Sequence, residues 1–160
     1  MGTMVGTTLL FVYGTLMRGF RLHDLLSQAK FRGEATVAGR LCDLGLFPAL
    51  SLDGVGRVQG EVYEVDAPTL RIIDRVEGYD AHCHSGPYLR EPVEVLSTDG
   101  KLLAVQVYAA NMNLAGRPQI ETGAIADYRL WVDRHPCPHV GMELRTTRKR
   151  FQTRGKATHA

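Results

Sequence analysis

Apolar stretches separated by turn-forming residues predict a chain built mainly of β-strands. Residues 9–13 are apolar without alternation, a pattern typical of a strand that is buried on both faces. Residues 56–65 alternate instead, so that Val58 and Val62 face one way and Glu61 faces the other. We therefore expect one fully buried strand and one strand with two different faces.

Further segments extend this pattern of strands and turns. Residues 32–44 alternate weakly and predict one extended strand, in which glycines mark bulges or bends. Residues 48–54 contain a proline and an Asp-Gly pair and predict a loop. Residues 88–97 and 102–110 predict two strands, and the Asp-Gly pair between them is a strong signal for a hairpin.

Helical patterns are fewer and shorter. Leucines at helical spacing predict a short helix or helical turn within residues 21–29. Asp66 suits an N-cap and Gly78 suits a C-terminal cap, so the segment between them predicts a second helix. A third helix is predicted near residues 122–134. Many strands, few helices and a central hairpin favour an α+β fold with a mixed or closed sheet.

Length and composition indicate one globular domain. A chain of 160 residues with 44% hydrophobic content can bury a sizeable core. The chain contains no apolar run of the roughly 20 residues that a membrane helix needs, and we expect no secretory signal. The three cysteines are odd in number and lack C-x-x-C spacing, which favours a reducing, cytoplasmic location over a disulfide framework.

The net charge of +2 conceals a basic C-terminal end. Residues 145–160 contain six basic residues and no acidic one, so the rest of the chain carries a net charge of −4. A basic segment can bind nucleic acid, but this one has little aromatic content and no helical apolar stripe. We therefore expect a domain over 1–144 and a flexible, solvated tail over 145–160, with nucleic-acid binding through the tail as an alternative.

The turn after the first strand is a candidate binding site. Residues 13–19 include Gly14 and Gly19 and lead out of the apolar strand. A turn of this kind can direct consecutive backbone N–H groups into one concavity, which favours a small anion such as a carboxylate. The spacing is not that of a phosphate-binding loop or a dinucleotide fingerprint. A strand followed by a tight turn, without a binding role, explains the same residues.

Five short motifs follow one another along residues 9–130. They are Tyr13-Gly14-Thr15-Leu16, Gly45-Leu46-Phe47-Pro48-Ala49, Val58-Gln59-Gly60-Glu61-Val62-Tyr63, Ile73-Asp74-Arg75-Val76-Glu77-Gly78-Tyr79 and Tyr88-Leu89-Arg90. This ordered set resembles the γ-glutamylcyclotransferase superfamily, in its branch of γ-glutamylamine cyclotransferase and avirulence-induced-gene-like proteins. The resemblance implies a small, mixed, distorted β-barrel with a few helices packed outside and a cavity at one end.

Glu77 is the candidate catalytic residue. It lies at the C-terminal end of the predicted helix, where the partial negative charge of the helix disfavours an anion, and it shares a stripe with Leu70 and Ile73. The helix end and partial burial both raise the pKa of a carboxyl group, which suits a general base at neutral pH. A surface glutamate before a capping glycine is the simpler alternative. The resemblance of Glu77-Gly78-Tyr79 to the family's catalytic segment favours catalysis.

The reaction that the resemblance implies needs one general acid/base and no cofactor. The α-amine of a γ-glutamyl substrate attacks the γ-carbonyl of the same molecule, and proximity supplies most of the rate. Glu77 takes a proton from this amine and delivers one to the departing amine, so the products are 5-oxoproline and a free amine. The residues implied in substrate binding are Tyr13, Gly14, Thr15, Leu16 and Tyr88. Tyr88 and Tyr108 are candidates for the cavity lining, and an aromatic of the barrel wall is the simpler explanation of each.

One segment departs from the family pattern. Residues 116–121 lack the tyrosine that the human-type enzyme carries beyond its last barrel strand. This difference favours a leaving group other than that of the dipeptide substrate. The Pro-x-Ile-x-x-Gly pattern followed by a tyrosine instead resembles the bacterial aminoglycoside-pathway cyclotransferase, which releases a γ-glutamyl cap from an antibiotic side chain.

Other chemistries fit the residues less well. Residues 82–84 and 135–139 bring histidine and cysteine together, but neither segment has the layout of a structural zinc site, so we expect loops and no metal. Thr15 has no His–Asp pair placed to activate it as a nucleophile. A non-catalytic small-ligand-binding protein on the same scaffold is the other alternative, and loss of Glu77 would be its sign. The patterns indicate neither the leaving amine nor the oligomeric state.

Overall fold

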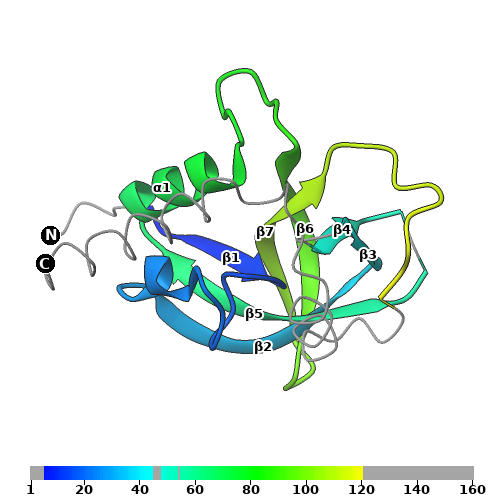
Figure 1. Ribbon diagram of the computed structural model, residues 1–160. Coiled ribbons are helices and arrows are strands. Elements are labelled where there is room, and N and C mark those ends of the chain that lie inside the picture. Colours follow the sequence, from blue (N-terminus) through cyan, green and yellow to red (C-terminus); the bar gives the residue numbers. More distant parts are fainter. Residues whose placement is uncertain (1–5, 45–47, 54, 121–160) are drawn as a thin grey trace, which may run out of the picture.

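The computed structural model describes residues 6–44, 48–53 and 55–120 (Figure 1). The elements in chain order are β1 (Thr8–Val12), the 3-10 helix η1 (His23–Leu26), β2 (Lys30–Ala38), β3 (Arg40–Asp43), β4 (Pro48–Ser51), β5 (Arg57–Val65), α1 (Ala67–Glu77), β6 (Tyr88–Ser97) and β7 (Leu102–Ala110). The helix expected near residues 122–134 and the basic residues 145–160 lie outside the described residues.

Five strands close into a barrel in the order β1-β5-β2-β6-β7. Neighbouring strands are antiparallel except at the closure, where β1 and β7 run parallel through the pairs Leu10–Gln106 and Phe11–Val107. Strands β3 and β4 form a separate antiparallel pair, and α1 lies beside β1 outside the barrel (Figure 1). The expected α+β fold with a small mixed barrel is confirmed.

The single strand expected over residues 32–44 is instead two strands in different sheets, β2 and β3, separated by Gly39. A Cβ atom at Gly39 would lie 2.5 Å from the carbonyl oxygen of Ser51. Only glycine therefore permits the two backbones to approach here. The expected loop over 48–54 is also corrected, because its first four residues form β4 and pair with β3.

The helix α1 has the ends that its capping residues predict. The Asp66 carboxylate accepts a hydrogen bond from the backbone N–H of Thr69 at 2.8 Å, which satisfies one of the free donors of the first turn. Gly78 ends the helix in the left-handed region, with φ of 74°. Glu77 is therefore the last residue of α1, as expected from the sequence.

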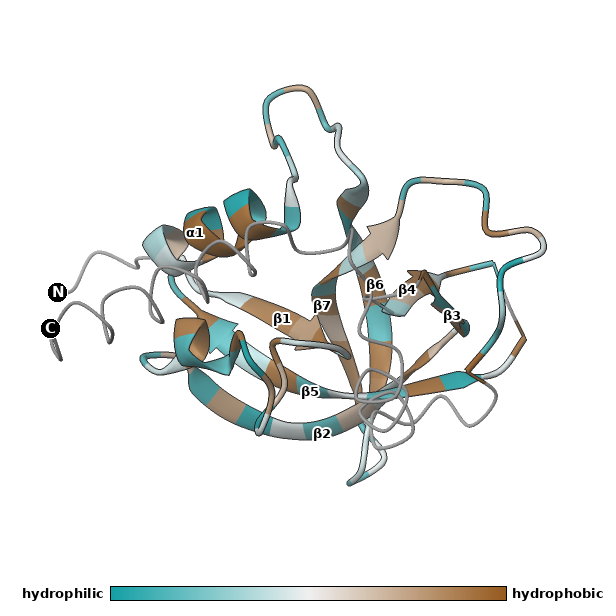
Figure 2. Cartoon of the chain, in the orientation of Figure 1, coloured by the Kyte–Doolittle hydropathy of each residue, from teal (hydrophilic) through white to brown (hydrophobic). Residues whose placement is uncertain are grey.

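Buried apolar side chains fill the barrel and the space under α1. Leu10, Phe11 and Val12 of β1 are each at most 3% exposed, which confirms a strand buried on both faces. Figure 2 shows most of this strand in brown. The expected alternation along β5 is only partly right, because residues 60–63 are buried on both faces. Glu61 consequently lies inside the molecule, at 4% exposure.

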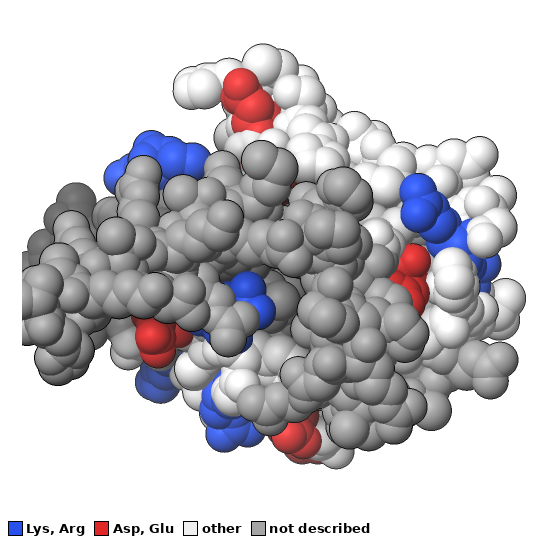
Figure 3. Space-filling view, viewed as in Figure 1, with Lys and Arg blue, Asp and Glu red and all other residues white. Residues whose placement is uncertain are grey.

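The described surface mixes charges of both signs. On the face shown in Figure 3, the basic and acidic residues of the described part are interspersed. None of the described helices is long and apolar enough to cross a membrane. Cys42 is buried, Cys83 is exposed, and both are free thiols.

Candidate active site

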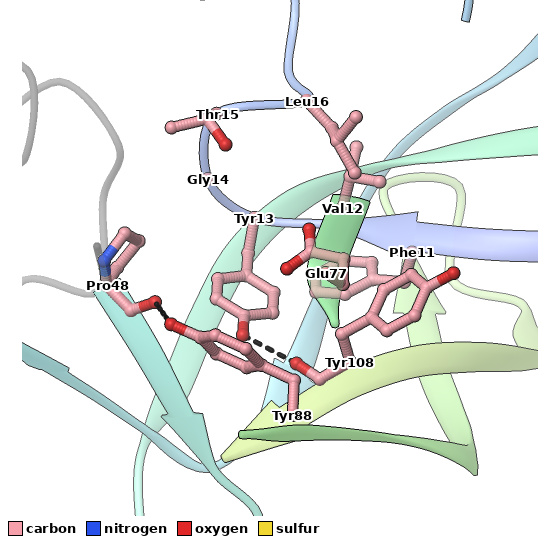
Figure 4. Close-up of a pocket in the computed structure, with 10 residues that line it drawn as sticks. All are labelled: Phe11, Val12, Tyr13, Gly14, Thr15, Leu16, Pro48, Glu77, Tyr88 and Tyr108. Carbon is pink, nitrogen blue, oxygen red and sulfur yellow. Dashed lines mark hydrogen bonds between the residues drawn. The ribbon is translucent and has the colours of Figure 1, made fainter. Parts of the chain in front are cut away.

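A pocket lies where the end of β1, the C-terminal end of α1 and the β6–β7 hairpin meet (Figure 4). It has a volume of about 30 Å³ and is lined by Phe11, Val12, Tyr13, Gly14, Thr15, Leu16, Pro48, Glu77, Tyr88 and Tyr108. Two more open hollows, of about 560 and 550 Å³, lie elsewhere on the described surface and contain neither Glu77 nor the turn after β1. The small pocket brings all the predicted site residues together.

Glu77 places a carboxylate in this pocket without a protein partner. Figure 4 shows the carboxylate pointing toward the turn at Gly14. No hydrogen bond or ion pair reaches it from the part of the chain that the structure describes. The side chain is partly buried, and burial raises its pKa from the ordinary 4.5 to about 7. A carboxyl group with this pKa can both accept and donate a proton near neutral pH.

The turn after β1 lines the same pocket with Gly14, Thr15 and Leu16. The carbonyl of Gly14 accepts from the N–H of Met17, and the carbonyl of Thr15 accepts from the N–H of Leu22, both at 3.0 Å. In a trans peptide the following N–H points the opposite way from the carbonyl, so the N–H groups of Thr15 and Leu16 are fixed in direction. Within the described residues the N–H groups of Gly14, Thr15 and Leu16 donate to no acceptor.

Three tyrosines form the pocket wall, and each commits its hydroxyl proton elsewhere. The Tyr13 hydroxyl donates to the backbone carbonyl of Tyr108 at 2.6 Å, and the Tyr88 hydroxyl donates to the carbonyl of Pro48 at 3.3 Å. The Tyr108 hydroxyl donates to Asp74 at 2.6 Å and points away from the Glu77 carboxylate (Figure 4). Burial raises the pKa values of the Tyr88 and Tyr108 hydroxyls, with a further contribution from Glu77 at Tyr88 and from Asp74 at Tyr108, so both stay protonated.

A buried ion pair behind the pocket is a feature that the sequence analysis missed. Arg90 on β6 donates to Asp74 on α1 through Nε at 2.8 Å and Nη2 at 3.2 Å. The same Asp74 accepts from Tyr108, and the Arg90 guanidinium lies 5.3 Å from the ring centre of Tyr79. Both charged residues lie within the family-like motifs, and this was the only signal available for them.

The histidines and cysteine of residues 82–84 lie in the loop between α1 and β6. His84 contacts the Tyr79 hydroxyl at 2.9 Å and the Glu91 carboxylate at 3.1 Å. The Cys83 thiol donates to Asp80 at 3.3 Å. Among the described residues, no three histidine, cysteine or acidic side chains are placed to hold a metal ion. Residues 135–139 lie outside the described part.

Comparison with known proteins gives a consistent result. Over 122 residues the chain is 31% identical to a protein of Methanocaldococcus jannaschii, covering 74% of this chain and 96% of that protein. It is 43% identical over 72 residues to the gamma-L-glutamyl-butirosin B gamma-glutamyl cyclotransferase of Niallia circulans, covering 44% of this chain and 46% of that enzyme.

The fold agrees as well. The crystal structure of an AIG2-like protein from Mus musculus superposes with a TM-score of 0.60 at 28% identity, over 72% of this chain and 86% of that one. Residues 10–131 match the family described as gamma-glutamyl cyclotransferase, AIG2-like. This match spans α1, every residue of the pocket and all of the barrel except the first two residues of β1, so the chain belongs to the AIG2-like gamma-glutamyl cyclotransferase family.

Proposed function

We propose that this protein is a γ-glutamyl cyclotransferase that converts a γ-glutamyl amide into 5-oxoproline and a free amine. The observation that carries the proposal is found in one pocket: the Glu77 carboxylate and the N–H groups of residues 14–16 lie together there, and none of them has a partner among the residues that the structure describes. A γ-glutamyl group has an anionic end and an amine that must lose a proton, and the pocket supplies a group for each. The family membership supports the same activity.

In the proposed mechanism the turn binds the α-carboxylate of the substrate through its N–H groups. This binding folds the substrate so that its α-amine approaches its own γ-carbonyl. The amine nitrogen forms a bond to the carbonyl carbon, and Glu77 takes the proton that the amine loses. When the bond between this carbon and the departing nitrogen breaks, Glu77 returns the proton to the departing amine. The carboxylate ends in the state in which it began, so a single residue serves both steps.

The environment of Glu77 supports this double role. Its pKa of about 7 is close to working pH, which favours proton transfer in both directions. The three tyrosine hydroxyls of the wall donate to other groups and do not stabilise the anion. The pocket thus offers N–H donors for the substrate carboxylate, and its tyrosine hydroxyls do not bond the Glu77 carboxylate. This combination suits the proposed cyclisation.

Two observations bear on the leaving amine: the segment of residues 116–120 and the substrate named for one relative. Residues 116–120 run beside β3, where the Pro118 carbonyl accepts from the N–H of Asp43 at 2.8 Å and the Ile120 N–H donates to the carbonyl of Leu41 at 2.8 Å. No tyrosine occurs in this segment. The relative in Niallia circulans is named for a γ-glutamyl-butirosin substrate. We therefore propose that the substrate is the amide of a larger amine rather than a dipeptide.

We also propose that the protein works in a reducing compartment. The free thiols of Cys42 and Cys83 support this location.

The direct test is to incubate the full chain with a panel of γ-glutamyl amides and dipeptides and to measure 5-oxoproline. We expect release from at least one amide, and none from the same amides when Glu77 is replaced by glutamine. Formation of glutamate instead of 5-oxoproline would show hydrolysis. A panel without any turnover, together with calorimetric binding of an intact amide, would favour the non-catalytic binding protein.

A further inference from the structure

A buried carboxylate that the proposed mechanism does not use anchors the turn after β1. Glu61 lies on β5 directly opposite Val12, the last residue of β1, and its side chain is 5% exposed. Its carboxylate accepts from the backbone N–H of Arg18, from Nε of Arg18 and from the hydroxyl of Tyr63, each at 3.0 Å. The two ends of the turn, Val12 and Arg18, are thus held by the same residue.

The backbone contacts show what this anchor fixes. The carbonyl of Met17 accepts from the N–H of Phe20 at 3.0 Å, and the N–H of the same peptide group, that of Arg18, donates to Glu61. This peptide plane is therefore bonded at both edges. Only one peptide group, whose Met17 N–H donates to the Gly14 carbonyl, separates it from the segment of free N–H groups, so its orientation limits how that segment can rotate.

Close packing brings Glu61 into reach of the turn. A Cβ atom at the preceding residue, Gly60, would lie 2.3 Å from the carbonyl oxygen of Val12 and 2.5 Å from the ring of Phe11. Glycine at this position allows β5 to approach the end of β1 closely. The carboxylate of Glu61 then extends past β1 to the far end of the turn.

Arg18 does not line the pocket itself. Its guanidinium lies 4.2 Å from the ring centre of Phe31 and is bonded to Glu61, with Glu34 at 3.9 Å. The described part of the pocket wall contains no arginine. Arg90, a second cation near the site among the described residues, is paired with Asp74. A substrate carboxylate in the pocket therefore depends on the backbone donors and on what holds them in place.

We propose that Glu61 is a positioning residue, which holds the turn in the shape that binds the substrate carboxylate. This inference rests on the proposed function, in which the turn binds that carboxylate. Without the Glu61 carboxylate, the N–H of Arg18 and the hydroxyl of Tyr63 lose a charged acceptor, and the turn is free to shift its backbone donors away from the substrate carboxylate.

The test compares two ligands that differ only in the charged group, 5-oxoproline and its uncharged carboxamide, 5-oxoprolinamide. Calorimetry on Glu61→Gln should show about tenfold weaker binding of 5-oxoproline, the effect of one misaligned charge-assisted interaction, and nearly unchanged binding of the carboxamide. In turnover of an active γ-glutamyl amide, KM should rise by about tenfold while kcat changes less than about twofold.

The matched control is Glu64→Gln on the same strand. Glu64 also pairs with an arginine, Arg32, at 2.8 Å, but it does not contact the turn. This variant should bind both ligands as the parent does. A general loss of stability in β5 would weaken the binding of both ligands equally. A positioning role of Glu61 instead lowers the preference for 5-oxoproline over 5-oxoprolinamide.

The parent protein and the variants answer separate questions. If the parent neither binds 5-oxoproline nor forms it, the proposed function fails, and the role of Glu61 fails with it. If the parent prefers 5-oxoproline and folded Glu61→Gln keeps that preference, the positioning role is overturned while the function stands. If Glu61→Gln does not fold, Arg18→Met decides. It keeps the backbone N–H but loses Nε, so its preference should fall by about threefold, and an unchanged preference overturns the proposal.

Discussion

Asp74 and Glu77 lie one turn apart on α1 and have opposite electrostatic environments. The Asp74 carboxylate accepts two hydrogen bonds from Arg90 and one from Tyr108. The Glu77 carboxylate has no partner in the described part of the chain, and burial raises its pKa to about 7. One helix thus carries a carboxylate whose two oxygens both accept hydrogen bonds beside one that can exchange a proton. Asp74 holds Tyr108 in place in the wall of the pocket that contains Glu77.

Replacing Glu77 by glutamine should abolish 5-oxoproline formation and leave ligand binding nearly intact. The amide has the same shape as the protonated carboxyl group but cannot accept the proton of the amine. Initial rates on the active substrate, with calorimetry of 5-oxoproline, provide the measurement. Activity within tenfold of the parent would contradict the assignment of the base.

The raised pKa of Glu77 also predicts how stability depends on pH. Between pH 4.5 and about 7 the folded protein binds more protons at this residue than the unfolded chain does. Stability from this source is complete below pH 4.5 and is lost as the pH rises through 7, by up to about 3 kcal/mol. Urea unfolding at pH 5 and pH 8 should show this loss in the parent and not in Glu77→Gln. Equal pH slopes in the two proteins would refute it.

The catalytic rate should show the corresponding dependence on pH. If the ionised Glu77 accepts the proton of the attacking amine, kcat/KM should rise with pH and reach half of its maximum near pH 7. Initial rates between pH 5 and 9 measure this curve. A half-maximal point near pH 4.5, the ordinary value for a glutamate, would show that the carboxylate is not buried during catalysis.

Replacing Asp74 by asparagine should destabilise the fold strongly. The change leaves Arg90 as a partly buried cation, with 19% side-chain exposure, without its anionic partner, a loss of about 3 kcal/mol. Thermal unfolding should show a large fall in Tm. The double variant Asp74→Asn with Arg90→Met should recover part of it, because no unpaired charge then remains. Equal losses in the single and double variants would show that the ion pair is not the cause.

The turn after β1 predicts different effects for two neighbouring substitutions. A Cβ atom at Gly14 would lie 3.1 Å from Cγ of Pro48, so Gly14→Val crowds the contact between the turn and Pro48 and adds bulk to the pocket wall. Thr15→Ser keeps every backbone donor. Binding of 5-oxoproline should therefore weaken far more in Gly14→Val than in Thr15→Ser. Equal affinities of Gly14→Val and the parent would show that the carboxylate is bound elsewhere.

Removing residues 145–160 should leave catalysis unchanged if the domain spans residues 1–144. Steady-state rates and Tm of the shortened and full-length chains give the comparison. A large loss of either would show that these residues form part of the catalytic domain. Binding of the full-length chain to nucleic acid that falls steeply with salt would support the alternative role of the basic segment.

Local signals predicted the elements whose ends depend on neighbouring residues. The limits of α1 follow from Asp66 and Gly78, because a capping residue acts within one turn. The division between β2 and β3 was missed because it depends on contact between Gly39 and Ser51, and periodicity carries no information about such a contact. The alternation along β5 placed Glu61 correctly on the face opposite Val58 but could not show that the turn after β1 covers that face.

The sequence likewise predicted one part of the site and left out another. Glu77 and the turn at residues 13–16 could be named because they form continuous motifs. Asp74 and Arg90 are 16 residues apart, on a helix and a strand, and no spacing rule relates such a pair. Pro48 was expected in a loop, and its place in the pocket wall depends on the pairing of β4 with β3. Residues that reach the site through long-range pairing are those that sequence patterns leave out.

The pocket is complete only once β7 has paired with β1, the contact that closes the barrel. The Tyr13 hydroxyl on one side of this contact and the Tyr108 carbonyl on the other are 95 residues apart in the chain. A growing chain that ends before residue 102 already contains Glu77 and the turn, yet it lacks the strand that joins them. We therefore expect the proposed activity to begin only after the barrel has closed, so the time at which activity appears during refolding would measure the time of closure.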